Sequence, residues 1–237
     1  MTWFPEAPRR QTDARRQRGA RTLRGAFGLF VSFAQPRLLV ASLTSWLALR
    51  LGVGGFDRID AAIVAAIVVY WPFQEWAAHI ALLHFKPRTV LGLRIDPFAA
   101  RMHRWHHRNP WIIERIFLPK RVLVLLTPVH AAIWWWACDE RGHALTGIAA
   151  FTAMALAYEW VHYIVHVPYI PRSRYARRIW KNHQLHHFKH EEYWHAFMAP
   201  GLDRLFGTSP DPKTIERSPT VRTLGVDDDF GEPKSSS

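Results

Sequence analysis

Apolar and polar residues alternate along this chain on the length scale of a membrane-spanning helix. Four stretches of 16 to 20 residues are predominantly apolar: Leu38–Phe56, Ala61–Trp76, Arg121–Cys138 and Ala144–Tyr163. A helix that crosses a bilayer needs about 20 mostly apolar residues. The pattern therefore predicts an all-α integral membrane protein with about four transmembrane helices. The alternative is a soluble bundle of four buried amphipathic helices.

The links between these stretches predict how the chain crosses the membrane. Short polar links, Asp57–Asp60 and Asp139–His143, join the stretches in pairs, as in antiparallel helical hairpins. The segments between and after the pairs are long and rich in Lys and Arg. Because positive charge accumulates on the cytoplasmic side of membranes, we expect both termini and these long segments to be cytoplasmic. This alternation of charge favours the membrane topology over the soluble bundle.

Composition narrows the classes of partner and cofactor. The chain has 31 Lys and Arg against 19 Asp and Glu, a formal net charge of +12. The arginines follow the loops and form no stripe interleaved with aromatic residues, so we expect no nucleic-acid partner. The single cysteine, Cys138, excludes a disulfide framework and a cysteine-based metal site.

The chain is expected to divide into three segments. We expect a basic cytoplasmic tail over residues 1–25, a membrane domain with a cytoplasmic helical cap over 26–208, and a tail or loosely packed arm over 209–237.

Ten of the fourteen histidines fall in four boxes at or just past the cytoplasmic ends of the predicted spans. The boxes are H-x4-H (His79, His84), H-x2-H-H (His103, His106, His107), H-x3-H (His162, His166) and H-x2-H-H (His183, His186, His187). On a helix, residues three and four apart share one face, so the last three boxes each present their rings together. His79 and His84 are five apart, about 140° around an ideal helix. They predict a break in the helix or an approach to the site from two sides.

So many imidazoles in patterned boxes predict a metal centre. Protonated rings packed together would repel one another and neutral rings would need partners, whereas divalent metal ions resolve both problems. Ten ligands exceed the shell of one ion and suit two. Four histidines fall outside the boxes. We expect no ligand role for His130 and His143, while His190 and His195 can line the site without being ligands.

The polar residues beside the boxes leave two interpretations open. Glu75 and Glu159 precede His79 and His162 by four and three residues. They either accept a hydrogen bond from the outer ring nitrogen of a metal ligand or form ordinary ion pairs. Asn182 is either a similar outer partner or a helix cap. Three arginines interleaved with the second box are expected to be solvated or to bind lipid headgroups: Arg101, Arg104 and Arg108.

The boxes and their surroundings resemble the fatty acid hydroxylase superfamily, which includes sterol desaturases, fatty acid 2-hydroxylases and carotenoid hydroxylases. The sequence segments around the boxes are also similar to those of the superfamily: FQEWAAHIALLH, YEWVHYIVH, NHQLHHFKHEEYW and DRLFGT. The resemblance runs from Trp71 to Thr208. It implies a multi-pass membrane oxygenase with two iron ions held by the ten histidines, which are then the catalytic residues. Zinc, which lies above iron in the affinity order, would be a substitute in purified protein.

The resemblance also implies the partners. The substrates would be dioxygen and a membrane lipid, with a fatty-acyl chain favoured over a carotenoid or sterol. An external ferredoxin, or a cytochrome with its reductase, would supply electrons, because the sequence contains no Gly-rich dinucleotide motif and no cysteine cluster. A different class of protein could also use the histidine boxes: a metal transporter or a metal-binding membrane protein that is not an enzyme. A transporter would place its ligands near the bilayer midplane, whereas these boxes lie past the predicted spans.

Overall fold

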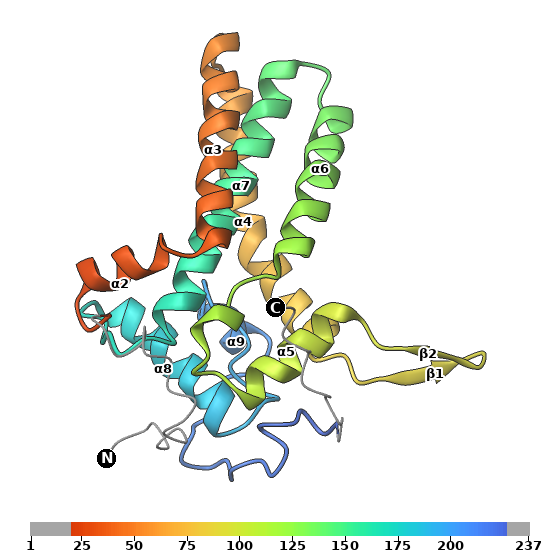
Figure 1. Ribbon diagram of the computed structural model, residues 1–237, viewed down its shortest axis with the longest axis vertical. Coiled ribbons are helices and arrows are strands. Elements are labelled where there is room, and N and C mark those ends of the chain that lie inside the picture. Colours follow the sequence, from red (N-terminus) through yellow and green to blue (C-terminus); the bar gives the residue numbers. More distant parts are fainter. Residues whose placement is uncertain (1–19, 227–237) are drawn as a thin grey trace, which may run out of the picture. The chain divides into compact units, whose positions relative to one another are not determined.

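The structure, a computed structural model, describes residues 20–226 and is mostly helical (Figure 1). Its helices are α2 (Leu23–Phe30), α3 (Ala34–Val53), α4 (Arg58–Ala78), α5 (Phe98–Arg108), α6 (Lys120–Ala137), α7 (Arg141–Ile164), α8 (Arg174–Phe188) and α9 (Gly201–Leu205), with a π-helical turn η1 (His79–Leu83) and a 3-10 turn η2 (Ile113–Arg115). The prediction of an all-α fold missed one element: strands β1 (Arg88–Val90) and β2 (Leu93–Ile95) form an antiparallel hairpin.

The chain divides into two compact units. Unit 1 contains the described residues up to Phe73 together with Trp111–Ile170, and unit 2 contains Gln74–Pro110 and the described residues from Pro171 onward. Three helical segments are long and apolar enough to cross a membrane: Arg58–Leu83, Ile113–Ala137 and Arg141–Ile164. Helices α2 and α3 meet at an angle of 82°, and together they would be a fourth candidate span if they form one broken span. Three to four candidate spans agree with the prediction of about four.

Helix α7 organises unit 1, where it packs against α3 and α6 (Figure 1). Its N-terminal half is buried and rich in small residues, which allow neighbouring helices to approach closely. The outer sides of α3 and α6 instead expose large apolar side chains, among them Leu51 and Leu125, each 67% exposed. Such a surface suits a lipid environment and would be a liability in water.

Gly147 sets how closely α6 approaches α7. A Cβ atom at this position would lie 2.2 Å from the ring of Trp134. We expect Gly147→Ala to lower the unfolding free energy of unit 1 by about 1–3 kcal/mol, because the ring must shift. The matched control is Gly52→Ala in α3, where the added Cβ meets nothing within 4 Å. Thermal unfolding in detergent measures both, and equal midpoints would show that the two helices do not pack as described.

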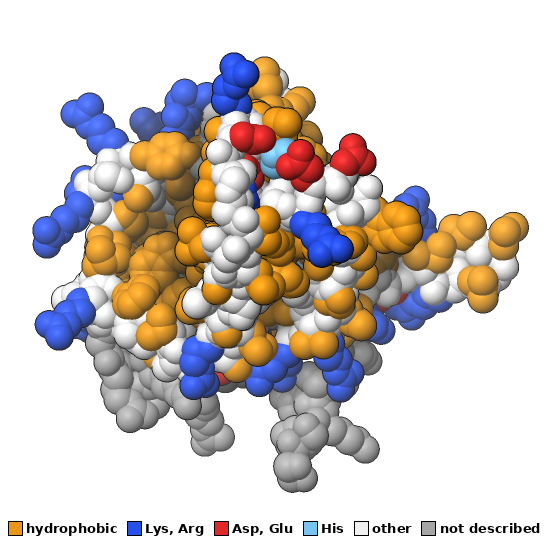
Figure 2. Space-filling model, turned by 90° about the horizontal axis from the view of Figure 1, so that it is seen from above, with side chains coloured by type: hydrophobic (Ala, Val, Ile, Leu, Met, Phe, Trp, Pro, Cys, Tyr) orange, Lys and Arg blue, Asp and Glu red, His pale blue; other side chains and the backbone are white. Residues whose placement is uncertain are grey.

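Arg50, a charged residue in an otherwise apolar stretch, is buried in a polar network at one end of unit 1. Its guanidinium donates to Asp60 of α4 at 2.8 Å and to Thr146 of α7 at 2.7 Å, and Thr146 donates to Asp60 at 2.5 Å. The same end carries His143, whose Nε2 lies 3.2 Å from Asp57. Figure 2 looks onto this end, where acidic side chains gather beside a histidine. The network joins three helices through one buried ion pair, which accounts for a charge in an apolar stretch.

Part of the expected C-terminal tail or arm lies within the described residues. Residues 209–226 form a packed arm of unit 2, in which Val221 and Leu224 are each 2% exposed. The arm is hydrogen-bonded as well, since the Ser218 amide donates to the Lys189 carbonyl at 2.9 Å. The Pro- and Ser-rich composition of this segment gave no sign that Val221 and Leu224 are core residues. Most of the predicted N-terminal tail (1–19) and the last residues, 227–237, lie outside the described part of the chain.

Candidate metal centre

The first histidine box lies on a break in helical geometry. After α4 the chain continues as the π-helical turn η1, in which the amide of His84 donates to the carbonyl of His79 at 3.0 Å. This i to i+5 bond brings residues five apart onto the same side, as an α-helix would not. The centroids of the two rings are therefore only 4.8 Å apart. Of the two expected arrangements, the structure has the break in the helix.

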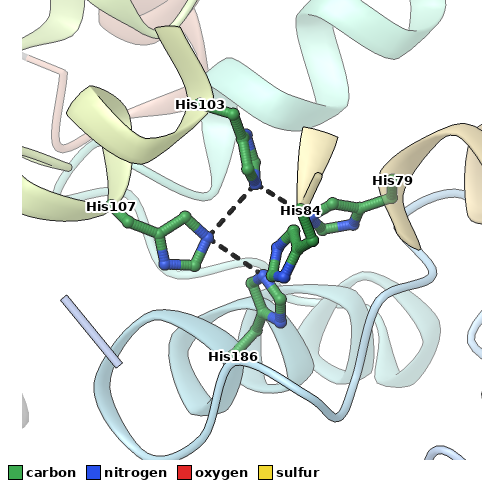
Figure 3. A group of neighbouring side chains, drawn as sticks. All are labelled: His79, His84, His103, His107 and His186. Carbon is green, nitrogen blue, oxygen red and sulfur yellow. Dashed lines mark hydrogen bonds between the residues drawn. The ribbon is translucent and has the colours of Figure 1, made fainter. Parts of the chain in front are cut away.

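Helices α5 and α8 bring two further boxes to the same place in unit 2. His103 and His107 of α5 are one turn apart, and His186 of α8 faces them. Figure 3 shows these three rings and the two from the first box converging, with their nitrogens turned inward. Each ring offers one nitrogen, and these five nitrogens all lie within 4.8 Å of one another, in the set His79, His84, His103, His107 and His186.

The contacts within this five-histidine cluster have the spacing of a coordination shell. The Nε2 atoms of His79 and His103 are 3.0 Å apart, and those of His103 and His107 are 3.2 Å apart. The Nε2 atoms of His107 and His186 are separated by 3.1 Å. Imidazole nitrogens bind zinc-like ions at about 2.0–2.1 Å, so neighbouring ligands of one ion lie roughly 3 Å apart.

Backbone carbonyls fix the tautomers of three of these rings. The Nδ1 atom of His79 faces the His195 carbonyl at 2.7 Å, and that of His186 faces the Tyr193 carbonyl at 2.8 Å. The Nδ1 atom of His107 faces the Val221 carbonyl at 3.1 Å. A carbonyl oxygen only accepts, so each Nδ1 carries the proton and each Nε2 presents a bare lone pair.

The positions of the ring protons show that the site fits a metal ion. His107 and His186 face each other through Nε2 atoms, and neither neutral ring has a proton there to donate. Protonating a ring would supply one, but burial and neighbouring imidazoles lower the pKa of both well below the usual value. The same causes lower the pKa of His84 and His103. Neutral imidazoles with converging lone pairs are the donor set of a first-row transition metal.

The other predicted ligands lie in two places. His106, His183 and His187 adjoin the cluster in unit 2, and the His187 ring centroid is 4.2 Å from that of His107 and 4.4 Å from that of His183. His162 and His166 belong to unit 1, at the end of α7, with ring centroids 5.0 Å apart. Unit 2 thus brings together eight of the ten predicted ligands.

The two glutamates neither accept a hydrogen bond from a histidine ring nor form an ion pair in the described structure. Glu75 accepts hydrogen bonds from the backbone amides of Phe197 at 2.5 Å and Met198 at 3.1 Å. It therefore holds the loop whose Phe197 ring stacks on His79 at 5.3 Å between centroids. Glu159 accepts from the Leu118 amide in unit 1 at 2.9 Å. Both carboxylates support backbone, so neither interpretation of them was right.

Arg104 also departs from the prediction of a solvated arginine. Its side chain is buried, with both oxygens of Asp96 at 2.8 and 2.9 Å and the Phe85 carbonyl at 3.1 Å. One guanidinium nitrogen, Nη2, donates to both oxygens of Asp96, and Nη1 donates to the Phe85 carbonyl. These contacts tie the histidine face of α5 to the segments on either side of the hairpin. No motif in the sequence indicated this ion pair, because Asp96 lies eight residues from Arg104 and outside the helix.

His195 lies at the cluster, although no box includes it. Its ring centroid is 5.3 Å from those of His79, His84 and His186. Asp203 fixes its loop by accepting from the amides of His195 and Ala196, each at 3.0 Å. Burial lowers the pKa of His195 to about 3. Asp203 belongs to the segment DRLFGT, whose only contribution to the sequence-based predictions was to the family resemblance.

A cavity of about 260 Å³ adjoins this edge of the cluster in unit 2. His84 and His195 line it together with Glu191, Glu192 and Lys86. Two histidine rings of the site therefore border a cavity.

The chain is similar to known proteins in sequence and in fold. Residues 64–208 match the profile of the family described as Fatty acid hydroxylase. Among curated proteins, the chain is 25% identical over 156 residues to "Dihydroceramide fatty acyl 2-hydroxylase FAH2" of Arabidopsis thaliana, covering 65% of this chain and 63% of that protein. It is 24% identical over 204 residues to "Ceramide very long chain fatty acid hydroxylase SCS7" of Saccharomyces cerevisiae, covering 80% of this chain and 51% of that protein.

A solved structure has a similar fold. Full-length scs7p, of which only the hydroxylase domain is visible, matches with a TM-score of 0.62 at 20% identity, over 77% of this chain and 68% of that one. The chain spans less than two thirds of the length of the two curated relatives described here.

Proposed function

This chain belongs to the fatty acid hydroxylase family, and from that membership we propose that it is a membrane-bound, non-haem di-iron oxygenase that hydroxylates a C–H bond of a fatty-acyl chain. The observation that carries the proposal is the five-histidine cluster with its carbonyl-fixed tautomers. Converging bare nitrogens in neutral, buried rings have no use in packing alone, because they repel one another without a cation.

The proposed metal ligands are all ten histidines of the four boxes. Eight lie together in unit 2, and His162 and His166 are included because the sequence pattern pairs their box with the others. Two iron ions held there would supply the redox chemistry that places one atom of dioxygen in the C–H bond and releases the other as water, with two electrons and two protons consumed. Zinc would bind the same nitrogens without that redox chemistry.

Contacts within the chain fix the orientation of the ligand rings. The carbonyls of Tyr193, His195 and Val221 keep the Nδ1 protons on the outer side of three rings. Such outer contacts orient ligands and raise their basicity. The π-turn keeps His79 and His84 on one side, and Glu75 and Asp203 fix the loop behind them.

The relatives support an acyl substrate. Their names describe action on the fatty-acyl parts of dihydroceramide and ceramide, and this chain shares their family. The apolar outer surface of unit 1 suits a substrate that arrives from the bilayer. We propose that dioxygen and electrons arrive from the cytoplasmic side, the electrons from a ferredoxin or from a cytochrome with its reductase. A carotenoid or sterol substrate would use the same site.

Lipid mass spectrometry tests the function. Cells that express the chain under isotopically heavy dioxygen should contain acyl lipids that have gained one heavy oxygen atom, and cells without it should not. Oxygenated carotenoids or sterols in place of acyl lipids would correct the substrate. The absence of any newly oxygenated lipid, together with altered metal uptake, would favour a transporter and contradict the proposal.

A further inference from the structure

The β1–β2 hairpin of unit 2 is amphipathic, and both of its strands are exposed along their whole length. Its paired residues are Arg88 with Ile95, Thr89 with Arg94, and Val90 with Leu93. Residues paired directly across two strands lie on the same face. One face therefore carries Val90, Leu93 and Ile95, which are 44%, 72% and 41% exposed, with Arg88 at its base. The other face carries Thr89 and Arg94.

The turn of the hairpin adds a fourth exposed apolar side chain at an unfavourable position. Leu91 and Gly92 form a two-residue turn with φ angles of 50° and 78°. Positive φ at both positions is the geometry of a primed hairpin turn, in which Asn, Asp or Gly is preferred. Leu91 is nevertheless 98% exposed. Neither the backbone nor packing within unit 2 accounts for leucine here.

An isolated two-stranded hairpin is marginally stable in water and needs a further strand or a packed surface. In Figure 1 the hairpin projects from η1 and α5, the elements that flank it in unit 2. Figure 2 shows hydrophobic side chains along the same projection. The described residues leave this apolar face uncovered.

The position of the hairpin in the chain indicates what covers it. The candidate span Arg58–Leu83 ends five residues before Arg88, and five residues reach at most about 18 Å. The base of the hairpin therefore starts near the surface of any bilayer that this helix crosses. Lys86 and Arg88 lie at that base, with the Arg88 guanidinium 4.3 Å from the centre of the Phe85 ring. Cations beside an apolar segment are typical of contact with anionic lipid phosphates.

We propose that this hairpin is a lipid-interface anchor. Val90, Leu91, Leu93 and Ile95 enter the apolar edge of the bilayer, and Arg88 stays at the level of the phosphates. The hairpin connects the first histidine box on η1 to the second on α5, so it ties both ligand-bearing segments to the lipid surface. This role is separate from the proposed hydroxylation and needs no bound metal for its test.

The test places a spin label at the tip. Because Cys138 is the single cysteine, Cys138→Ser with Leu91→Cys gives one labelling site in the full chain. The protein is reconstituted in vesicles of phosphatidylcholine and phosphatidylglycerol, and the accessibility of the label to oxygen is compared with that to a water-soluble nickel chelate. We expect severalfold greater access for oxygen at this site. A label at Lys213, exposed on the C-terminal arm, should show the reverse.

A label at Ile95→Cys, on the same apolar face, gives a second reading in case the tip substitution alters the turn. Nickel access at both sites equal to that at Lys213 would overturn the proposal. So would spin–spin broadening between labels on two chains without preferential oxygen access, because a second copy would then be what covers the hairpin. Oxygen preference at both sites, lost when the protein is moved from vesicles to a lipid-free amphipathic polymer, would support it.

Discussion

His186→Ala and His107→Ala should each remove hydroxylated product by more than about 100-fold, while the protein still inserts into the membrane. Each substitution deletes one of two bare Nε2 atoms that face each other at 3.1 Å. Loss of an outer partner of a ligand already costs about 10- to 100-fold in affinity or activity, and loss of a ligand should cost more. Product is measured by lipid mass spectrometry and bound metal by elemental analysis of the purified chain.

The control is His190→Ala. His190 follows the fourth box closely, but its side chain is 22% exposed and lies beside Glu191, outside the cluster. It should keep both product and metal near the levels of the unaltered chain. If His186→Ala left product unchanged, the cluster would not be the reactive site. If it lowered product but left metal content unchanged, the ring would serve in another way than as a ligand.

Removal of the second half of the C-terminal arm should be nearly as damaging, although the arm contains no histidine. A chain that ends after Arg217 loses the Val221 carbonyl that fixes the tautomer of His107. It also loses Arg222, which donates to the Arg108 carbonyl, and the two core residues Val221 and Leu224. We expect metal affinity to fall about 10- to 100-fold, the range for outer partners of ligands.

The matched control for the arm is a chain that ends after Val226. It lacks only residues 227–237, which lie outside the described structure, and should bind metal as the full chain does. Metal titration followed by thermal unfolding separates the two effects, because loss of packing lowers the midpoint even without metal. Equal metal affinity in both truncated chains would show that the arm has no part in orienting His107.

Several features of the site were predictable from local spacing. The i, i+3, i+4 pattern of the second and fourth boxes needs only a helix to bring three rings to one face, and α5 and α8 are such helices. The five-residue spacing of His79 and His84 predicted a break, and η1 is that break. The apolar stretches predicted the spans to within a few residues because lipid imposes a length that composition reveals.

What could not be predicted depends on contacts between distant residues. The Val221 carbonyl is 114 residues from His107, and the Phe197 amide is 122 residues from Glu75. Backbone donors and acceptors leave no trace in the residue type, so no motif marks them. The same holds for Arg104, whose identity alone suggested solvent and whose partner, Asp96, makes it a buried residue.

The metal stoichiometry of the chain purified from iron-supplemented cells, together with its Mössbauer spectrum, tests the di-iron site most directly. We expect two iron ions per chain in a site rich in nitrogen ligands, and a large loss of bound iron in His107→Ala. A chain that binds no iron, or that keeps two ions after His107 is replaced, would contradict this expectation.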